Sequence, residues 1–146
     1  MTTQARRRLI NDYKKFTKEA AGLGILVQSK PDNMMIWEAI IFGPDDTDWE
    51  GGVFKLNMEF PDKFPGEPPK VRFLSKMFHP NIYENGNICL DILDKRWSPL
   101  MDCLAILASI QSLLTDPNPD SPANNEAAGL FTEHKDASKS GSLSEY

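Results

Sequence analysis

Hydrophobic residues near the start of the chain recur at the spacing of an amphipathic helix. The apolar stripe between residues 5 and 20 consists of Leu9, Tyr13, Phe16 and Ala20. Thr2 or Thr3 can cap the first turn, because a hydroxyl oxygen accepts a bond from a free backbone N–H group. The pattern predicts an N-terminal helix with one face against a core.

Four later runs have the patterns of β-strands. Residues 53–60 alternate between apolar and polar side chains, which is typical of a strand with one buried and one wet face. Residues 35–42 are apolar on both faces apart from Glu38, which favours a central strand. Residues 25–30 and 71–74 complete the set. The short connections predict an antiparallel meander, whose apolar face a helix must cover.

A second helix meets that requirement. Residues 103–114 are apolar on nearly every side, which predicts a buried helix, and Asp102 is its expected N-cap. A third, short helix is expected to begin at Ser121, and the serine-rich residues 137–146 predict a flexible tail. The expected fold is therefore α+β: an N-terminal helix, a four-stranded antiparallel meander, a long loop, a central buried helix, and a short C-terminal helix. We expect one domain over residues 1–136, followed by the tail.

Length, charge and cysteine content narrow the function classes. The chain has 146 residues, which is about one domain, and a net charge of −5, which argues against a surface built for direct nucleic-acid binding. Two cysteines and two histidines are too few and too badly spaced for a structural zinc site, so no metal and no cofactor are expected. No apolar run approaches about 18 residues, so no membrane span is expected.

The segment between the last strand and the buried helix is irregular. Residues 79–99 follow neither a period of 2 nor one of 3.6, yet they are rich in large apolar side chains. Irregular segments that pack their own side chains often carry function. Cys89 lies at its centre, whereas Cys103 falls in the predicted buried helix. We expect both thiols to be reduced, as in a cytosolic or nuclear protein.

This segment resembles the active-site region of ubiquitin-conjugating enzymes. The matching residues are the triplet His79-Pro80-Asn81, Cys89 eight positions after the asparagine, Leu90-Asp91-Ile92-Leu93 and Trp97-Ser98-Pro99. The resemblance runs from about residue 5 to about residue 134 and is closest to the branch that marks histones and the replication clamp in DNA damage tolerance. It implies an acyltransferase that carries ubiquitin as a thioester on Cys89.

Taken alone, the cysteine has two interpretations. An ordinary buried thiol is common in proteins, and the spaced motif is what favours a nucleophile at Cys89. No His, Lys or Arg lies within five residues of Cys89, so nothing in the local sequence activates the thiol strongly. A modest nucleophile is adequate for exchange with another thioester.

The residues before the cysteine also leave alternatives. Asn81 can donate its amide N–H to the oxyanion that forms when a lysine attacks the thioester, or it can hold the loop by bonds to backbone. His79 can be considered as the basic partner of a hydrolase-like Cys–His pair, but loop architecture is favoured because no third orienting group is evident. Pro80 and Tyr83 are expected to shape the same loop.

The attacking lysine must lose a proton, and the resemblance places Asp91, Asp120 and Ser121 around its approach. The family often has a carboxylate where Ser121 stands, so Asp120 or a modified Ser121 is expected to substitute. Ser121 is also the expected cap of the third helix. Together with Pro122 it forms a minimal proline-directed phosphorylation site.

Basic residues open the first helix. Arg6, Arg7 and Arg8 lie where the helix dipole disfavours positive charge, and we expect them to be mostly exposed. They form either a solvated face or a partner surface. The resemblance implies the second, because this helix meets the activating enzyme and the ligase in the family. It further assigns ligase contact to Phe64, Trp97, Ser98 and Pro99.

Two features bear on the partners. Gly66 stands where members that serve HECT ligases carry a large aromatic side chain, so a RING-type ligase is expected. Residues 93–97 lack the insertion of the SUMO-conjugating member and of the acidic-loop branch, so ubiquitin is the expected cargo. The implied partners are thus ubiquitin, its activating enzyme, a RING-type ligase and substrate lysines, in the cytoplasm and nucleus. Conjugation of another ubiquitin-like modifier, or non-catalytic ubiquitin binding, stays open.

Overall fold

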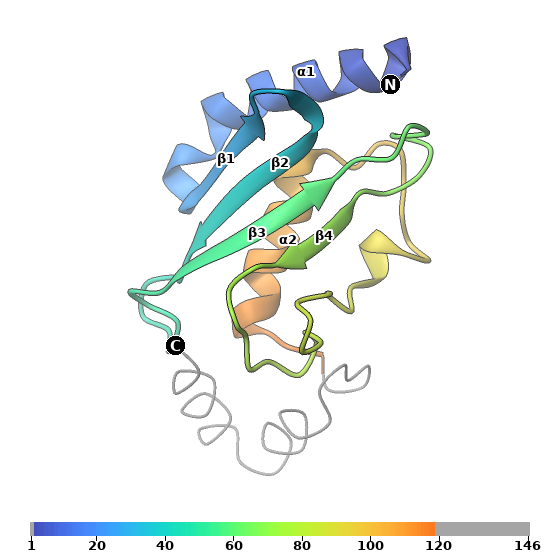
Figure 1. Cartoon of the computed structure of the whole chain (residues 1–146). Coiled ribbons are helices and arrows are strands. Elements are labelled where there is room, and N and C mark those ends of the chain that lie inside the picture. The colour runs from blue at the N-terminus through green and yellow to red at the C-terminus, as the bar shows by residue number, and fades with distance from the viewer. Residues whose placement is uncertain (1, 119–146) are drawn as a thin grey trace.

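The computed structural model describes residues 2–118, and Figure 1 shows their arrangement. In chain order the elements are α1 (Thr3–Glu19), a 3-10 turn (Ala21–Leu23), β1 (Ile25–Lys30), β2 (Asn33–Phe42), β3 (Val53–Glu59), β4 (Lys70–Phe73), a second 3-10 turn (Asp91–Leu93) and α2 (Cys103–Thr115). The predicted third helix and tail lie outside the described residues. The predicted α+β meander is confirmed.

The four strands form one antiparallel sheet in the order β1-β2-β3-β4. Residue pairs such as Ala39 with Leu56 and Leu56 with Phe73 carry one buried face through the three strands from β2 to β4. β3 alternates buried and exposed side chains as predicted. β2 starts two residues earlier than predicted, at Asn33, and β4 spans 70–73 instead of 71–74. Errors of this size are usual where strand ends meet turns.

α1 lies across β1 and β2 and also contacts α2 (Figure 1). Its first turn is capped by Thr2, whose hydroxyl oxygen accepts a bond of 3.0 Å from the Ala5 backbone N–H. Leu9 and Phe16 are buried on the predicted stripe. A polar residue, Asp12, is buried on the same side of the helix, which the periodicity did not indicate.

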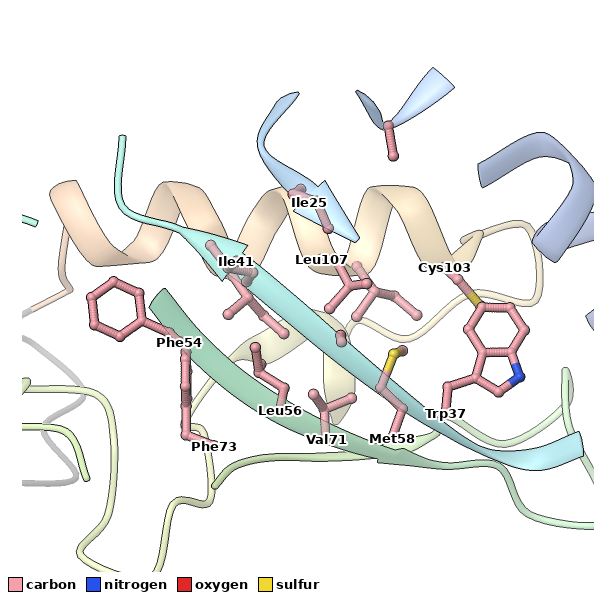
Figure 2. Close-up of a cluster of buried hydrophobic side chains, with 14 of the residues drawn as sticks. Ile25, Trp37, Ile41, Phe54, Leu56, Met58, Val71, Phe73, Cys103 and Leu107 are labelled. Atoms are coloured by element: carbon pink, nitrogen blue, oxygen red, sulfur yellow. The ribbon is translucent and has the colours of Figure 1, made fainter. Parts of the chain in front are cut away.

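α2 covers the inner face of the sheet. Figure 2 shows Leu107 and Cys103 of this helix in one cluster with side chains from all four strands, among them Ile25, Leu56 and Val71. Asp102 caps the helix by accepting a bond of 2.8 Å from the Ala105 backbone N–H, as predicted. Because α2 is apolar nearly all round, its packing fixes the position of its C-terminal end, which lies beside the segment that carries Cys89.

Candidate active site around Cys89

Cys89 lies on an irregular β-hairpin. Its backbone N–H donates to the Asn81 carbonyl oxygen over 2.8 Å, and the Tyr83 N–H donates to the Asn87 carbonyl over 2.8 Å. An isolated bridge between Ile82 and Ile88 completes the ladder. Residues 79–99 thus contain a short hairpin that no alternation in the sequence revealed, and this hairpin sets Asn81 directly opposite Cys89.

A glycine attaches the hairpin to the sheet. Gly86 has a φ of +92°, and its carbonyl oxygen accepts a bond of 2.9 Å from the Phe73 N–H at the end of β4. A Cβ atom at this position would come within 2.0 Å of the Phe73 carbonyl oxygen. Any other residue at position 86 would therefore push the hairpin off the sheet edge.

His79 anchors the first strand of the hairpin to α2. The ring is 1% exposed; its Nδ1 accepts from the Asn81 backbone N–H over 3.0 Å, and its Nε2 lies 2.7 Å from the Leu113 carbonyl oxygen. Because Nδ1 accepts, the single proton of the neutral ring is on Nε2 and is donated to Leu113. Burial lowers the pKa of His79 to about 4, against the opposing effect of the Leu113 bond. Both nitrogens bind backbone, which argues against a Cys–His pair.

The Asn81 side chain forms a second anchor. It is fully buried; its Nδ2 donates to the Asn118 carbonyl oxygen over 2.6 Å, and its Oδ1 accepts from the Asn118 N–H over 2.7 Å. This two-bond pairing ties the hairpin to the chain that follows α2. Of the two roles considered for Asn81, this geometry favours loop support. Asn118 was missed as a site residue, because in the sequence it is only part of the proline-containing stretch 116–119 that follows the predicted buried helix.

A groove of about 460 Å³ runs past the cysteine. It is lined by Tyr83, Ile88, Cys89, Leu90, Asp91, Leu93, Asp94, Lys95, Leu113 and Asn118. The structure thus brings together three of the predicted residues, Cys89, Asp91 and Tyr83, whereas Pro80 is buried and does not line the groove. Asp120 and Ser121, the other predicted residues of the lysine approach, lie outside the described residues.

The two thiols differ in what they can do. Cys89 is partly exposed in the groove, whereas Cys103 is completely buried under α1. Burial raises the pKa of Cys103, and the nearby Asp12 carboxylate raises it further. Only Cys89 is both reachable and placed beside groove residues. Within residues 2–118 no group of His, Cys, Asp or Glu could hold a metal ion, and no helix there is long and apolar enough to cross a membrane.

The predicted partner surface lies at the start of α1 and in residues 97–101. Arg6 and Arg7 are exposed as expected. Arg8 is not: its side chain is 23% exposed, pairs with Asp12 at 3.0 Å, and donates to the carbonyl oxygens of Pro99 and Met101. Asp12 in turn accepts from the Cys103 backbone N–H at 3.2 Å. We name this set of contacts the Arg8 clip, since it joins α1, residues 97–101 and the start of α2.

Phe64 requires a correction. We expected it to contact a ligase, but it is 1% exposed, so its surface is not available to a partner. The Arg8 guanidinium lies 5.9 Å from the centre of its ring, and Trp97 covers it at 6.2 Å between ring centres. Phe64 therefore packs beneath Arg8 and Trp97 of the predicted partner surface. Leu100, which is 90% exposed beside Pro99, is the large apolar residue that the surface actually presents.

Comparison with known proteins gives a consistent result. The family model described as ubiquitin-conjugating enzyme matches residues 8–143. Ubiquitin-conjugating enzyme E2 3 of Arabidopsis thaliana is 57% identical over 135 residues, which is 92% of this chain and 89% of that relative. Ubiquitin-conjugating enzyme E2 2 of Saccharomyces cerevisiae is also 57% identical over 135 residues, 92% of this chain and 78% of that relative. The chain therefore belongs to the ubiquitin-conjugating enzyme family, whose members are transferases.

Proposed function

We propose that this chain accepts ubiquitin from the activating enzyme as a thioester on Cys89 and transfers it to lysine side chains of protein substrates. The family as a whole works with ubiquitin, activating enzymes and ligases. The observation that supports the assignment to Cys89 is the contrast between the two thiols: Cys89 opens into a groove, and Cys103 is buried in the core.

The transfer has two steps. In charging, the Cys89 thiolate attacks the thioester on the activating enzyme, and the enzyme's own thiolate leaves. In discharge, a neutral lysine amine attacks the new thioester, and the Cys89 thiolate leaves as the isopeptide bond forms. Asn81 and His79 keep the Cys89 backbone in place during both steps through their bonds to Asn118 and Leu113.

Partner choice follows from the surface at the start of α1. Arg6 and Arg7 offer exposed positive charge, and residues 97–100 present Trp97, Ser98, Pro99 and the exposed Leu100. We assign this surface to the activating enzyme and to a RING-type ligase. The exposed Gly66 lacks the aromatic side chain associated with HECT ligases. We assign the chain to the branch that acts on histones and the replication clamp in DNA damage tolerance, and on that basis we propose that it works in the nucleus as well as the cytoplasm.

A charging assay tests the proposal. With activating enzyme, ATP, Mg²⁺ and ubiquitin, the wild-type chain should form an adduct that disappears when a thiol reductant is added. Cys89→Ala should form none, Cys103→Ala should still form it, and Cys89→Ser should give a longer-lived oxygen ester. A reducible adduct on Cys89→Ala would contradict the assignment. Replacing ubiquitin by other ubiquitin-like modifiers in the same assay identifies the cargo, and failure with every modifier would indicate a non-catalytic variant.

A further inference from the structure

The groove that holds Cys89 also contains a lysine that the transfer reaction does not use. Lys95 lies six positions after the cysteine, lines the same groove, and is exposed. The neighbouring basic residue is engaged, since Arg96 lies 3.6 Å from the Asp91 carboxylate. Within residues 2–118 no carboxylate pairs with Lys95. An unpaired primary amine therefore shares a groove with the thiol that carries an electrophilic acyl group.

The backbone around Lys95 is held in place on both sides. The Asp94 N–H donates to the Asp91 carbonyl over 3.0 Å, and the Arg96 N–H donates to the same carbonyl over 2.9 Å. Trp97 then fixes the segment to the proline-rich loop, because its indole N–H donates to the Pro65 carbonyl over 2.9 Å. These bonds restrict the backbone while the Lys95 side chain stays free to rotate. The amine is thus kept at the groove without being tied to one position.

We propose that Lys95 is an acceptor for the ubiquitin carried on Cys89 of the same chain. The inference rests on the proposed function, because it requires the Cys89 thioester. The neutral Lys95 amine attacks the thioester carbonyl carbon, the carbon–sulfur bond breaks, and the Cys89 thiolate leaves. The nitrogen gives up a proton to solvent, and an isopeptide bond remains. No oxidant, reductant or further ATP is consumed in this step.

Proximity decides which acceptor reacts first. An amine tethered to the same chain through a short segment has an effective concentration on the order of millimolar, which exceeds the concentration of a second enzyme molecule in solution. Transfer to Lys95 should therefore be intramolecular. Once formed, the isopeptide-linked ubiquitin stays at the groove that Cys89 shares, so a modified molecule should recharge more slowly. The arrangement limits the lifetime of charged enzyme that meets no substrate.

The test follows reductant-resistant product from charged enzyme. The full-length chain is charged, the activating enzyme is stopped by chelating Mg²⁺, and samples are taken with and without thiol reductant across pH 7 to 9. Peptide mass spectrometry locates the modified lysine. We expect product on Lys95, formed faster at higher pH because only an unprotonated amine is a nucleophile. Its first-order rate should be unchanged by a roughly tenfold dilution of the enzyme.

Matched variants distinguish modification of Lys95 from modification of other lysines. Lys95→Arg keeps the positive charge but removes the nucleophile, and it should lose about nine-tenths or more of the product while its thioester lasts longer. Lys30→Arg is the control, since Lys30 pairs with Glu38 at 3.0 Å and lies outside the groove; it should behave as wild type. A tagged Cys89→Ala chain added as acceptor should remain unmodified.

Two results would overturn the inference. One is that Lys95→Arg and Lys30→Arg form equal amounts of reductant-resistant product, which would mean that Lys95 is an exposed charge and not an acceptor. The other is modification of the Cys89→Ala acceptor as fast as that of the charged chain, which would make the reaction intermolecular. Failure to form any reducible adduct would instead refute the proposed function at Cys89, and the assay reports that separately.

Discussion

Mild acid should destabilise this protein through one buried histidine. His79 binds the Leu113 carbonyl and the Asn81 N–H with its neutral ring, and burial lowers its pKa to about 4 from 6.5. Between pH 6.5 and pH 4 the unfolded chain therefore binds a proton at this site that the folded chain does not. Since the unfolded state binds more protons in this window, stability is present above pH 6.5 and falls as the pH is lowered.

The size of the effect follows from the same pKa values. A ring with a pKa of 6.5 in the unfolded state and about 4 in the folded state lowers the free energy of unfolding by about 2 kcal/mol between pH 7.5 and pH 5. The loss levels off at about 3 kcal/mol below pH 4. Such a change is a substantial fraction of the stability of a domain of this size.

Urea denaturation at a series of pH values measures this contribution. His79→Gln cannot be protonated at this position, so the part of the pH dependence that comes from His79 should disappear, whatever the variant's stability at pH 7.5. The only other histidine is His134, and His134→Gln serves as the control. An NMR titration should find the His79 ring still neutral at pH 5. If His79→Gln and wild type lose stability in parallel between pH 7.5 and pH 5, the reasoning is wrong.

Three further predictions concern the anchors of the site and of the proposed partner surface. Asn81→Ala removes both bonds to Asn118, so it should lower the free energy of unfolding by about 1–2 kcal/mol and weaken charging. If the variant instead has normal stability but discharges about 100-fold more slowly, Asn81 acts as an oxyanion donor. Arg8→Ala leaves the buried Asp12 carboxylate without its cationic partner and should lower the free energy of unfolding by about 2–3 kcal/mol, measured by thermal unfolding. Arg8→Lys should restore only part of this loss. Arg8→Ala and Leu100→Ala should have non-additive effects on the ligase concentration needed for half-maximal discharge, and additive effects would mean that the clip only stabilises the fold.

The elements were predictable because each follows a local period. The stripe of α1, the alternation of β3 and the apolar surface of α2 all appear in the sequence, and the caps at Thr2 and Asp102 have ordinary side-chain chemistry. The errors in the sheet lie at the start of β2, the end of β3 and both ends of β4, where backbone pairing across the sheet sets the boundary. No local signal determines such an end.

The site was predictable only in part, since its contacts join distant parts of the chain. The resemblance located Cys89, His79 and Asn81, but it did not say that His79 binds Leu113, which lies 34 positions away. Asn118 lies 37 positions from Asn81 and carries no signal of its own beyond a helix stop.

The burial of residues in the expected ligase surface was misjudged for the same reason. Phe64 lies in a proline-rich stretch whose sequence is typical of an exposed loop. In the structure, however, Trp97 and Arg8 cover its ring, although both are distant in sequence. Arg8, one of three consecutive arginines, looks identical to Arg6 and Arg7 until Asp12 and residues 97–101 are placed around it. Burial of single side chains in such places depends on tertiary contacts that periodicity does not encode.

The anchors also explain how the fold serves Cys89. The last carbonyl groups of a helix have no partner within the helix, and in α2 one of them, on Leu113, is satisfied by His79. This one hydrogen bond satisfies the Leu113 carbonyl and also fixes the hairpin to the helix. Asn81 forms a similar anchor, because its side chain makes two hydrogen bonds with the backbone of Asn118 just past the helix end. Both anchors are uncharged side chains bound to backbone groups of α2 and its extension, so they hold the Cys89 backbone without using an ion pair. The fold therefore acts on this cysteine through position, and in the proposed transfer the energy comes from the thioester that the activating enzyme delivers.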